Sequence, residues 1–233
     1  MEQNLKGKAI TAAAVVIAGL MLPLSVAKFR SYERTVDVKG LCEKELKADK
    51  AIWPLTYKVV GNDLSQVLEE TDRSNEEIRN FLIQGGIKDE EISVTAPQIS
   101  DKYASEYGNN DRVYRYLVTN IITVCTADID VVLALNGKLP ELMKKGIAFV
   151  GDDWQNRTQF NFENLNSVKP AMIEEATANA REAARKFAQD SDSRLGKIKK
   201  ATQGSFSISD RDSNTPYIKK VRVVTNITYY LKD

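Results

Sequence analysis

The sequence predicts an α+β protein, in which mixed or antiparallel sheets pack against about three helices behind an N-terminal transmembrane or signal helix. Several segments alternate apolar and polar residues with the period of two that is typical of a half-buried strand. Segments with helical spacing separate groups of these strands, and hairpin-like turns join the strands within a group. The N-terminus carries a long uncharged stretch. The first two observations favour the α+β class, and the third indicates the N-terminal helix.

The chain divides near residue 30 into a leader and a folded body. The body, residues 31–233, has the length of one α+β domain or of two intimately packed subdomains. In the leader, residues 1–30, the stretch Ala9–Ala27 carries no charge, and its length approaches the roughly 20 residues that cross a bilayer as a helix. Basic side chains flank this stretch on both sides, namely Lys6, Lys8, Lys28 and Arg30.

Two interpretations of the leader stay open. Ser25-Val26-Ala27 matches the small-residue cleavage site of a signal peptide. The uncharged stretch is longer than the roughly 7–15 apolar residues of a signal peptide, which favours an uncleaved anchor. In both cases we expect the body outside the cytoplasm, because a short N-terminal tail before a large domain is the usual arrangement of exported proteins.

The first half of the body begins with two predicted strands. The second of them places Trp53, Leu55 and Tyr57 on one face, and Pro54 predicts an edge position or a bulge, because proline cannot donate a ladder hydrogen bond. Asp63 offers an N-cap to the helix that follows. The predicted elements are strands over 32–41 and 49–60, a helix over 64–82, strands over 92–100 and 113–125, and a polar loop over 103–112 between the last two.

The second half of the body combines two helical segments with short strands. Gly137 and Pro140 make the helix over 128–145 short or broken. The best helix runs over 168–189, with Pro170 in its first turn, where the missing N–H costs little. Its apolar face consists of Ile173, Ala176, Ala180, Ala184, Phe187 and Ala188. Strands are predicted over 147–150, 159–163, 195–203, 205–209 and 221–231, with a polar loop over 210–216.

The composition excludes several classes of function. The chain has no histidine, the commonest general base near neutral pH and the commonest nitrogen ligand of zinc, so Ser-His-Asp and Cys-His catalysis are excluded. No glycine pattern of a phosphate-binding loop is present. The formal net charge is +1, so the basic excess of a nucleic-acid-binding protein is missing. We therefore predict no catalytic, cofactor-binding or metal-ligating residues, and no nucleic acid among the partners.

The remaining carboxylates and thiols give only weak candidates. The acidic groups Asp89/Glu90/Glu91, Asp152/Asp153 and Glu174/Glu175 are explained as solvated turns or helix starts, since neighbours in sequence do not predict carboxylates that face each other across a cleft. Asp152-Asp153 with Asn156 misses the spacing of a calcium loop. Cys42 and Cys125 are too few for a thiolate metal site. They are expected either to form a disulfide in an oxidising compartment or to pack as free thiols.

The order of segments resembles that of SIMPL-domain proteins over residues 33–231. The resemblance rests on the motifs Val38-Lys39-Gly40, Ala48-Asp49-Lys50-Ala51, Gly86-Ile87 with Ile92, the alanines 176, 180, 184 and 188 with Arg181, and Leu195-Gly196-Lys197-Ile198. It implies a bacterial periplasmic or envelope-associated α+β protein that often self-associates and is linked to stress tolerance. The family has no established catalytic residues, so none is carried over.

The leading hypothesis is a non-enzymatic envelope protein that acts through self-assembly or partner binding. Its expected location is the periplasmic side of the bacterial inner membrane, or the periplasm if the leader is cleaved. The expected partners are further copies of the chain and, through the leader, the membrane. One rival is an enzyme that uses carboxylates or tyrosines on cell-wall or glycan substrates, which requires two facing carboxylates. Another is a small-ligand carrier, which requires an enclosed apolar pocket.

Overall fold

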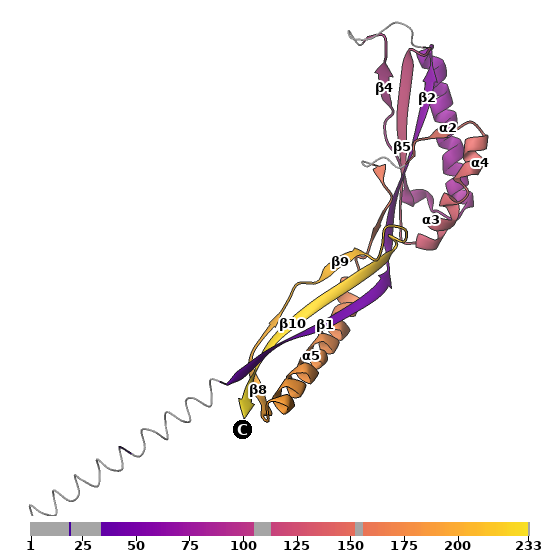
Figure 1. Cartoon of the computed structure of the whole chain (residues 1–233). Coiled ribbons are helices and arrows are strands. Elements are labelled where there is room, and N and C mark those ends of the chain that lie inside the picture. Colours follow the sequence, from indigo (N-terminus) through magenta and orange to yellow (C-terminus); the bar gives the residue numbers. More distant parts are fainter. Residues whose placement is uncertain (1–18, 20–33, 105–112, 152–155, 233) are drawn as a thin grey trace, which may run out of the picture. The chain divides into compact units, whose positions relative to one another are not determined.

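The computed structural model describes residue 19 and residues 34–104, 113–151 and 156–232, and these form an α+β fold with antiparallel sheets. The predicted fold class is therefore confirmed. The described chain separates into two compact units (Figure 1). The first unit comprises the chain up to Lys44, Asn166–Ser207 and the chain from Val221, and the second comprises Glu45–Leu165 and Ile208–Lys220.

The predicted leader, residues 1–30, lies outside the described residues apart from Gly19. None of the helices in the described ranges is both long and apolar enough to cross a membrane.

The first unit contains one long helix and most of a four-stranded sheet, whose strand β9 falls largely in the second unit. The order of strands is β1 (Thr35–Lys47), β10 (Ile218–Lys232) and β8 (Arg194–Gln203), and β9 (Ser207–Asp210) also pairs with β10. Helix α5 (Leu165–Asp190) packs against this sheet (Figure 1). The core between them is made of Val38, Ala180, Ala184, Ile227 and Tyr229, with Val36, Ala183 and Leu195 at its margin.

The small residues of α5 let the helix approach β1 closely. A Cβ atom added at Gly40 would lie 1.8 Å from the carbonyl oxygen of Ala176 and 2.6 Å from the backbone nitrogen of Ala180. Met172, Ala176, Ala180, Ala184 and Ala188 are the buried residues of the helix. The alanines and the Gly40 position are therefore explained by packing, since only a missing side chain on β1 leaves room for the helix backbone.

The second unit contains a six-stranded sheet around the long pair β2 and β5. The strand order is β3, β5, β2, β6, while β4 also pairs with β5 and β7 also pairs with β2. The strands are β2 (Lys50–Gly61), β3 (Ile92–Val94), β4 (Gln98–Asp101), β5 (Tyr116–Thr126), β6 (Ala148–Phe149) and β7 (Gln159–Asn161).

Helices cover one face of the β2–β5 pair. They are α2 (Leu64–Gln84), α3 (Ile129–Asn136) and α4 (Leu139–Lys144) (Figure 1). A 3₁₀ turn over Asp89–Glu91 leads into β3. The largest core cluster lies beneath them and includes Trp53, Leu55, Ile78, Ile122 and Val132. Asp63 caps α2 as predicted, because its carboxylate accepts a hydrogen bond from the backbone N–H of Gln66 at 3.1 Å.

Pro54 lies at a local sheet edge, as the sequence predicts. On one side β2 pairs with β5 in an unbroken register from Ala51 to Gly61, so Pro54 carries no bulge. On its other side, β7 reaches only to Ile52 and β6 begins at Tyr57, and no described strand pairs with the proline between them. The missing N–H therefore costs no hydrogen bond in the described sheet.

Three details of the predicted elements are wrong. Helix α5 begins at Leu165, so Pro170 is its sixth residue and lies beyond the first turn, where it removes the hydrogen bond to the Asn166 carbonyl. Phe187 does not share the buried face, since 61% of it is exposed. The strand predicted over 92–100 is two short strands, β3 and β4, separated by Pro97 and its neighbours. The broken helix is confirmed as α3 and α4.

Candidate functional site

The face of the β2–β5 pair opposite the helices carries a continuous ladder of side chains. Because directly opposed residues of an antiparallel pair share a face, the register defines five cross-strand pairs on it. These pairs are Ile52 with Cys125, Pro54 with Thr123, Thr56 with Ile121, Lys58 with Thr119, and Val60 with Leu117. We call this set of ten residues the open face.

The open face is apolar in character, with threonines interspersed and Lys58 as its one charged member. Val60 is 47% exposed, and Leu117, Ile121 and Ile52 are half-buried. None of these four belongs to the core cluster beneath the helices. Thr56, in the middle of the set, is buried. Among the described residues no helix covers this side of the pair, and exposed apolar residues of this kind favour contact with another protein.

The second unit also contains a cleft of about 800 Å³. Buried apolar side chains form part of its wall, and the rings of Phe160 and Tyr217 meet edge to face with their centroids 6.0 Å apart. Polar side chains form the rest, including Asn136, Arg157 and Gln159. The cleft therefore differs from the enclosed apolar pocket that a carrier of apolar ligands requires.

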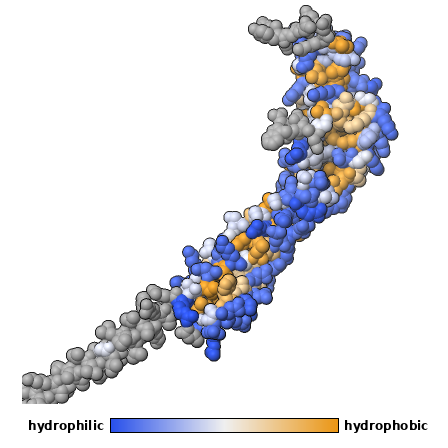
Figure 2. Space-filling view, viewed as in Figure 1, coloured by the Kyte–Doolittle hydropathy of each residue, from blue (hydrophilic) through white to orange (hydrophobic). Residues whose placement is uncertain are grey.

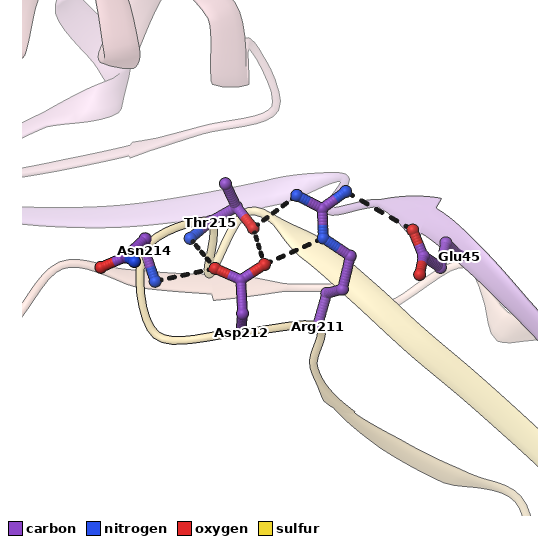
Figure 3. A network of polar contacts seen from close by, with 5 residues as sticks. All are labelled: Glu45, Arg211, Asp212, Asn214 and Thr215. Carbon is purple, nitrogen blue, oxygen red and sulfur yellow. Dashed lines mark hydrogen bonds and ion pairs between the residues drawn. The ribbon is translucent and has the colours of Figure 1, made fainter.

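Two aspartates line the cleft, and both are tied to other groups. The Asp212 carboxylate accepts hydrogen bonds from the backbone N–H groups of Asn214 and Thr215 at 2.9 and 2.8 Å, from the Thr215 hydroxyl, and from Nε of Arg211 at 2.9 Å (Figure 3). Arg211 also reaches Glu45 at 3.5 Å. The carboxylate thus closes the loop between β9 and β10.

These hydrogen bonds fix the charge of Asp212. They hold the pKa of its carboxyl far below the usual range, with the Thr215 hydroxyl as the largest cause and Arg211 as the next. A carboxyl that stays ionised at neutral pH cannot donate a proton as a general acid.

The second aspartate, Asp210, forms an ion pair with Lys219 of β10. Lys219 is 7% exposed, so this charge is held in the wall of the cleft by its partner. Asp210 and Asp212 therefore each face a cation, in contrast to the facing carboxylates of a glycosidase.

Three carboxyl groups elsewhere in the described chain follow the same pattern. The pKa values of Asp89, Asp101 and Glu175 are lowered, with hydrogen bonds from Arg79, Arg115 and Lys44 as the respective largest causes. Each of these carboxylates thus has a cationic side chain as its partner, which keeps it ionised.

The weak sequence candidates lie apart from the cleft. Glu90 and Glu91 belong to the 3₁₀ turn before β3, and Glu174 lies on the exposed surface of α5. Asp152 and Asp153 lie outside the described residues. Within the described ranges, no three residues of the metal-ligating types gather in one place.

Both cysteines are free thiols. Cys42 is buried in β1 and Cys125 is exposed in β5. The pKa of Cys42 is raised, chiefly by burial and then by its hydrogen bond with Glu175. Of the two alternatives left open by the sequence, the structure therefore shows free thiols and no disulfide between Cys42 and Cys125. Cys42 is packed in the interior, while Cys125 belongs to the open face.

The sequence gives little indication of the cleft. One side of its wall comes from residues 210–219, of which 210–216 are predicted as a polar loop between two strands, and such loops are common on protein surfaces. The pattern Asp212-Ser213-Asn214-Thr215 is nevertheless a turn signal, because an aspartate side chain often accepts hydrogen bonds from backbone N–H groups two or three residues later.

The fold defines an α+β domain of two compact units, and among the described residues no helix covers the open face. Comparison with known protein families matches residues 36–229 to SIMPL, described as a protein of unknown function (DUF541). The match covers most of the chain, and the chain therefore belongs to the SIMPL family, which confirms the resemblance seen in the sequence. No curated protein matches the chain.

Proposed function

We propose that this chain is a non-enzymatic cell-envelope protein that works by binding, through the open face, a second copy of itself or a protein partner. The open face carries the proposal. It presents Val60, Leu117 and Ile121 on a regular two-stranded ladder, and shape-matched apolar surface is what drives protein association. In the view of Figure 2, apolar residues reach the surface between hydrophilic areas.

The envelope location is supported by the sequence of the leader. Ala9–Ala27 is uncharged and flanked by basic residues, which favours delivery to the membrane and a body on the periplasmic side of the bacterial inner membrane. A cleaved leader would instead release the body into the periplasm. A role in stress tolerance is part of this proposal, and the family resemblance is what supports it.

A binding role is also supported by the state of the carboxylates. Asp212 and Asp210, the two aspartates that line the cleft, are engaged with Arg211 and Lys219. A carboxylate-dependent hydrolase would need one of them as an acid with a raised pKa. The pKa of Asp212 is instead lowered.

The test is the mass of the body in solution. The full chain is folded with a protease site inserted after residue 30, the body is released, and its mass is measured by light scattering over a range of concentrations. We expect more than one copy per particle. The double variant Val60→Lys/Leu117→Lys should dissociate these particles, because two buried lysines without partners oppose association.

Ile83→Lys is the matched control. Ile83 is 42% exposed but lies on α2, on the helical side of the unit, so this variant should keep the mass of the wild type. A strict monomer at high concentration overturns self-assembly and leaves only a different protein as the partner. Equal effects of the open-face and control variants would refute the assignment of the surface.

The cleft supports a second candidate, a site for a small polar ligand such as a glycan fragment. Its volume of about 800 Å³ lies within the range of ligand sites, and its wall combines the Phe160 and Tyr217 rings with amides. Titration with soluble cell-wall fragments, followed by thermal unfolding, should raise the midpoint in the wild type. Asn136→Ala should reduce this shift, and no shift with any fragment would exclude the candidate.

A further inference from the structure

A groove between α5 and β8 gathers positive charge in the first unit. Its volume is about 410 Å³. Three cationic side chains line it, Arg181 and Arg185 from α5 and Lys197 from β8. The remaining wall is largely apolar and includes Leu195, Ile198 and Tyr229.

The three cations have no counter-ion in the described chain. No ion pair or hydrogen bond joins Arg181, Arg185 or Lys197 to another side chain among the residues described, although the neighbouring Lys186 pairs with Asp190 at 2.9 Å. Arg181 and Arg185 lie one helical turn apart, so both guanidinium groups flank the same stretch of groove. Three unpaired positive charges around one hollow favour an anionic ligand.

A buried hydroxyl gives an independent indication of a ligand. Tyr229 lines the groove, is 3% exposed, and belongs to the core with Ala180 and Ala184. Its hydroxyl oxygen is buried and has no hydrogen-bond partner among the described residues. Leaving a buried donor unpaired costs free energy, and an acceptor oxygen of a ligand bound against Tyr229 would supply the missing bond.

The groove lies at the end of the sheet where the chain enters from the leader. The backbone N–H of Leu231 donates to the carbonyl of Arg34 at 2.8 Å, and Leu231 faces Leu195 across the β10–β8 pair. The Arg34 side chain also donates to the hydroxyl of Ser193 at 2.9 Å. Arg34 lies four positions after the predicted leader. It is thus bonded to Leu231, which in turn faces Leu195, a residue that lines the groove.

We propose that this groove binds the phosphate group of an anionic phospholipid of the membrane to which the leader delivers the chain. Guanidinium groups bind phosphate oxygens through paired hydrogen bonds, which suits Arg181 and Arg185. Leu195 and Ile198 supply apolar surface for the carbon atoms next to the phosphate. The inference rests on the envelope location proposed above, but it involves residues other than those of the open face.

The experiment uses the full chain in an uncharged detergent. Short-chain phosphatidylglycerol is titrated in, and the thermal unfolding midpoint is followed as a measure of binding. We expect the midpoint to rise with lipid concentration. Phosphatidylcholine with the same acyl chains and inorganic phosphate serve as comparisons, and both should give much smaller shifts.

Two groove variants and one control locate the site. Arg181→Gln/Arg185→Gln should weaken the apparent affinity about tenfold or more, because two charge-assisted hydrogen-bond donors are lost. Lys199→Gln/Lys200→Gln removes the same charge from β8 outside the groove and should leave the affinity within about twofold. Tyr229→Phe should leave the unliganded midpoint unchanged or higher and reduce the lipid-induced shift.

Each other result overturns the proposal. An equal shift with inorganic phosphate would assign the groove to free phosphate, and an equal shift with phosphatidylcholine would remove the selectivity for an anionic lipid. Equal losses in the groove and control variants would reduce the effect to general electrostatics. These results are independent of the light-scattering test, so the failure of one proposal does not imply the failure of the other.

Discussion

Gly40 shows at the scale of one residue how the first unit is assembled. We expect Gly40→Ala to lower the free energy of unfolding by about 1–3 kcal/mol or more, because its Cβ atom would meet backbone atoms of α5 that no rotamer change can move. Denaturant unfolding of the full chain measures the loss. Gly151→Ala is the control, since nothing lies within 4 Å of the added atom, and it should change the stability by less than about 0.5 kcal/mol.

Asp212 predicts a pH dependence of stability. Its carboxyl has a lower pKa in the folded chain than the usual value of about 3.9, so its stabilising effect is complete above that value and is lost as the pH falls below it. Asp212→Asn should therefore be less stable than the wild type at neutral pH. The gap should narrow as unfolding is measured at successively lower pH, and a gap that stays constant would contradict the assignment.

At the scale of elements, α5 offers a direct test of where a helix begins. Pro170 lies inside the helix, where proline removes a hydrogen bond and crowds the preceding turn. Pro170→Ala should raise the free energy of unfolding by about 1 kcal/mol or more. If the helix instead began near residue 168, as the sequence predicts, Pro170 would occupy a favourable first-turn position and the variant would be no more stable.

Strand elements were more predictable than the surfaces they form. The alternation of Trp53, Leu55 and Tyr57 locates β2 and its buried face, because one face of that strand meets the helices. Phe187 was misplaced because helical spacing alone cannot tell which side of a helix with many alanines meets the sheet. The cleft and the α5–β8 groove combine residues that are distant in sequence, and no local pattern predicts such combinations.

For the whole molecule, the two proposals predict opposite responses to salt. Association through the open face depends on apolar contacts, so raising the ionic strength roughly tenfold should maintain or strengthen it. Binding of anionic lipid to Arg181, Arg185 and Lys197 should weaken over the same range. Light scattering and lipid titration at matched salt concentrations provide the comparison, and parallel responses would be inconsistent with the two surfaces as assigned.

The register of β8 bears on how large an assembly can become. Between Leu195 and Ile198, and again between Ile198 and Lys200, β8 contains one residue more than the facing stretch of β10. A strand from another molecule that tried to extend the sheet past β8 would lose its hydrogen-bond pairing at both places. Lysines at 197, 199 and 200 add repulsion between identical edges. For the self-assembly proposed above, growth by edge addition would stop at this strand, which favours particles of fixed size over fibres.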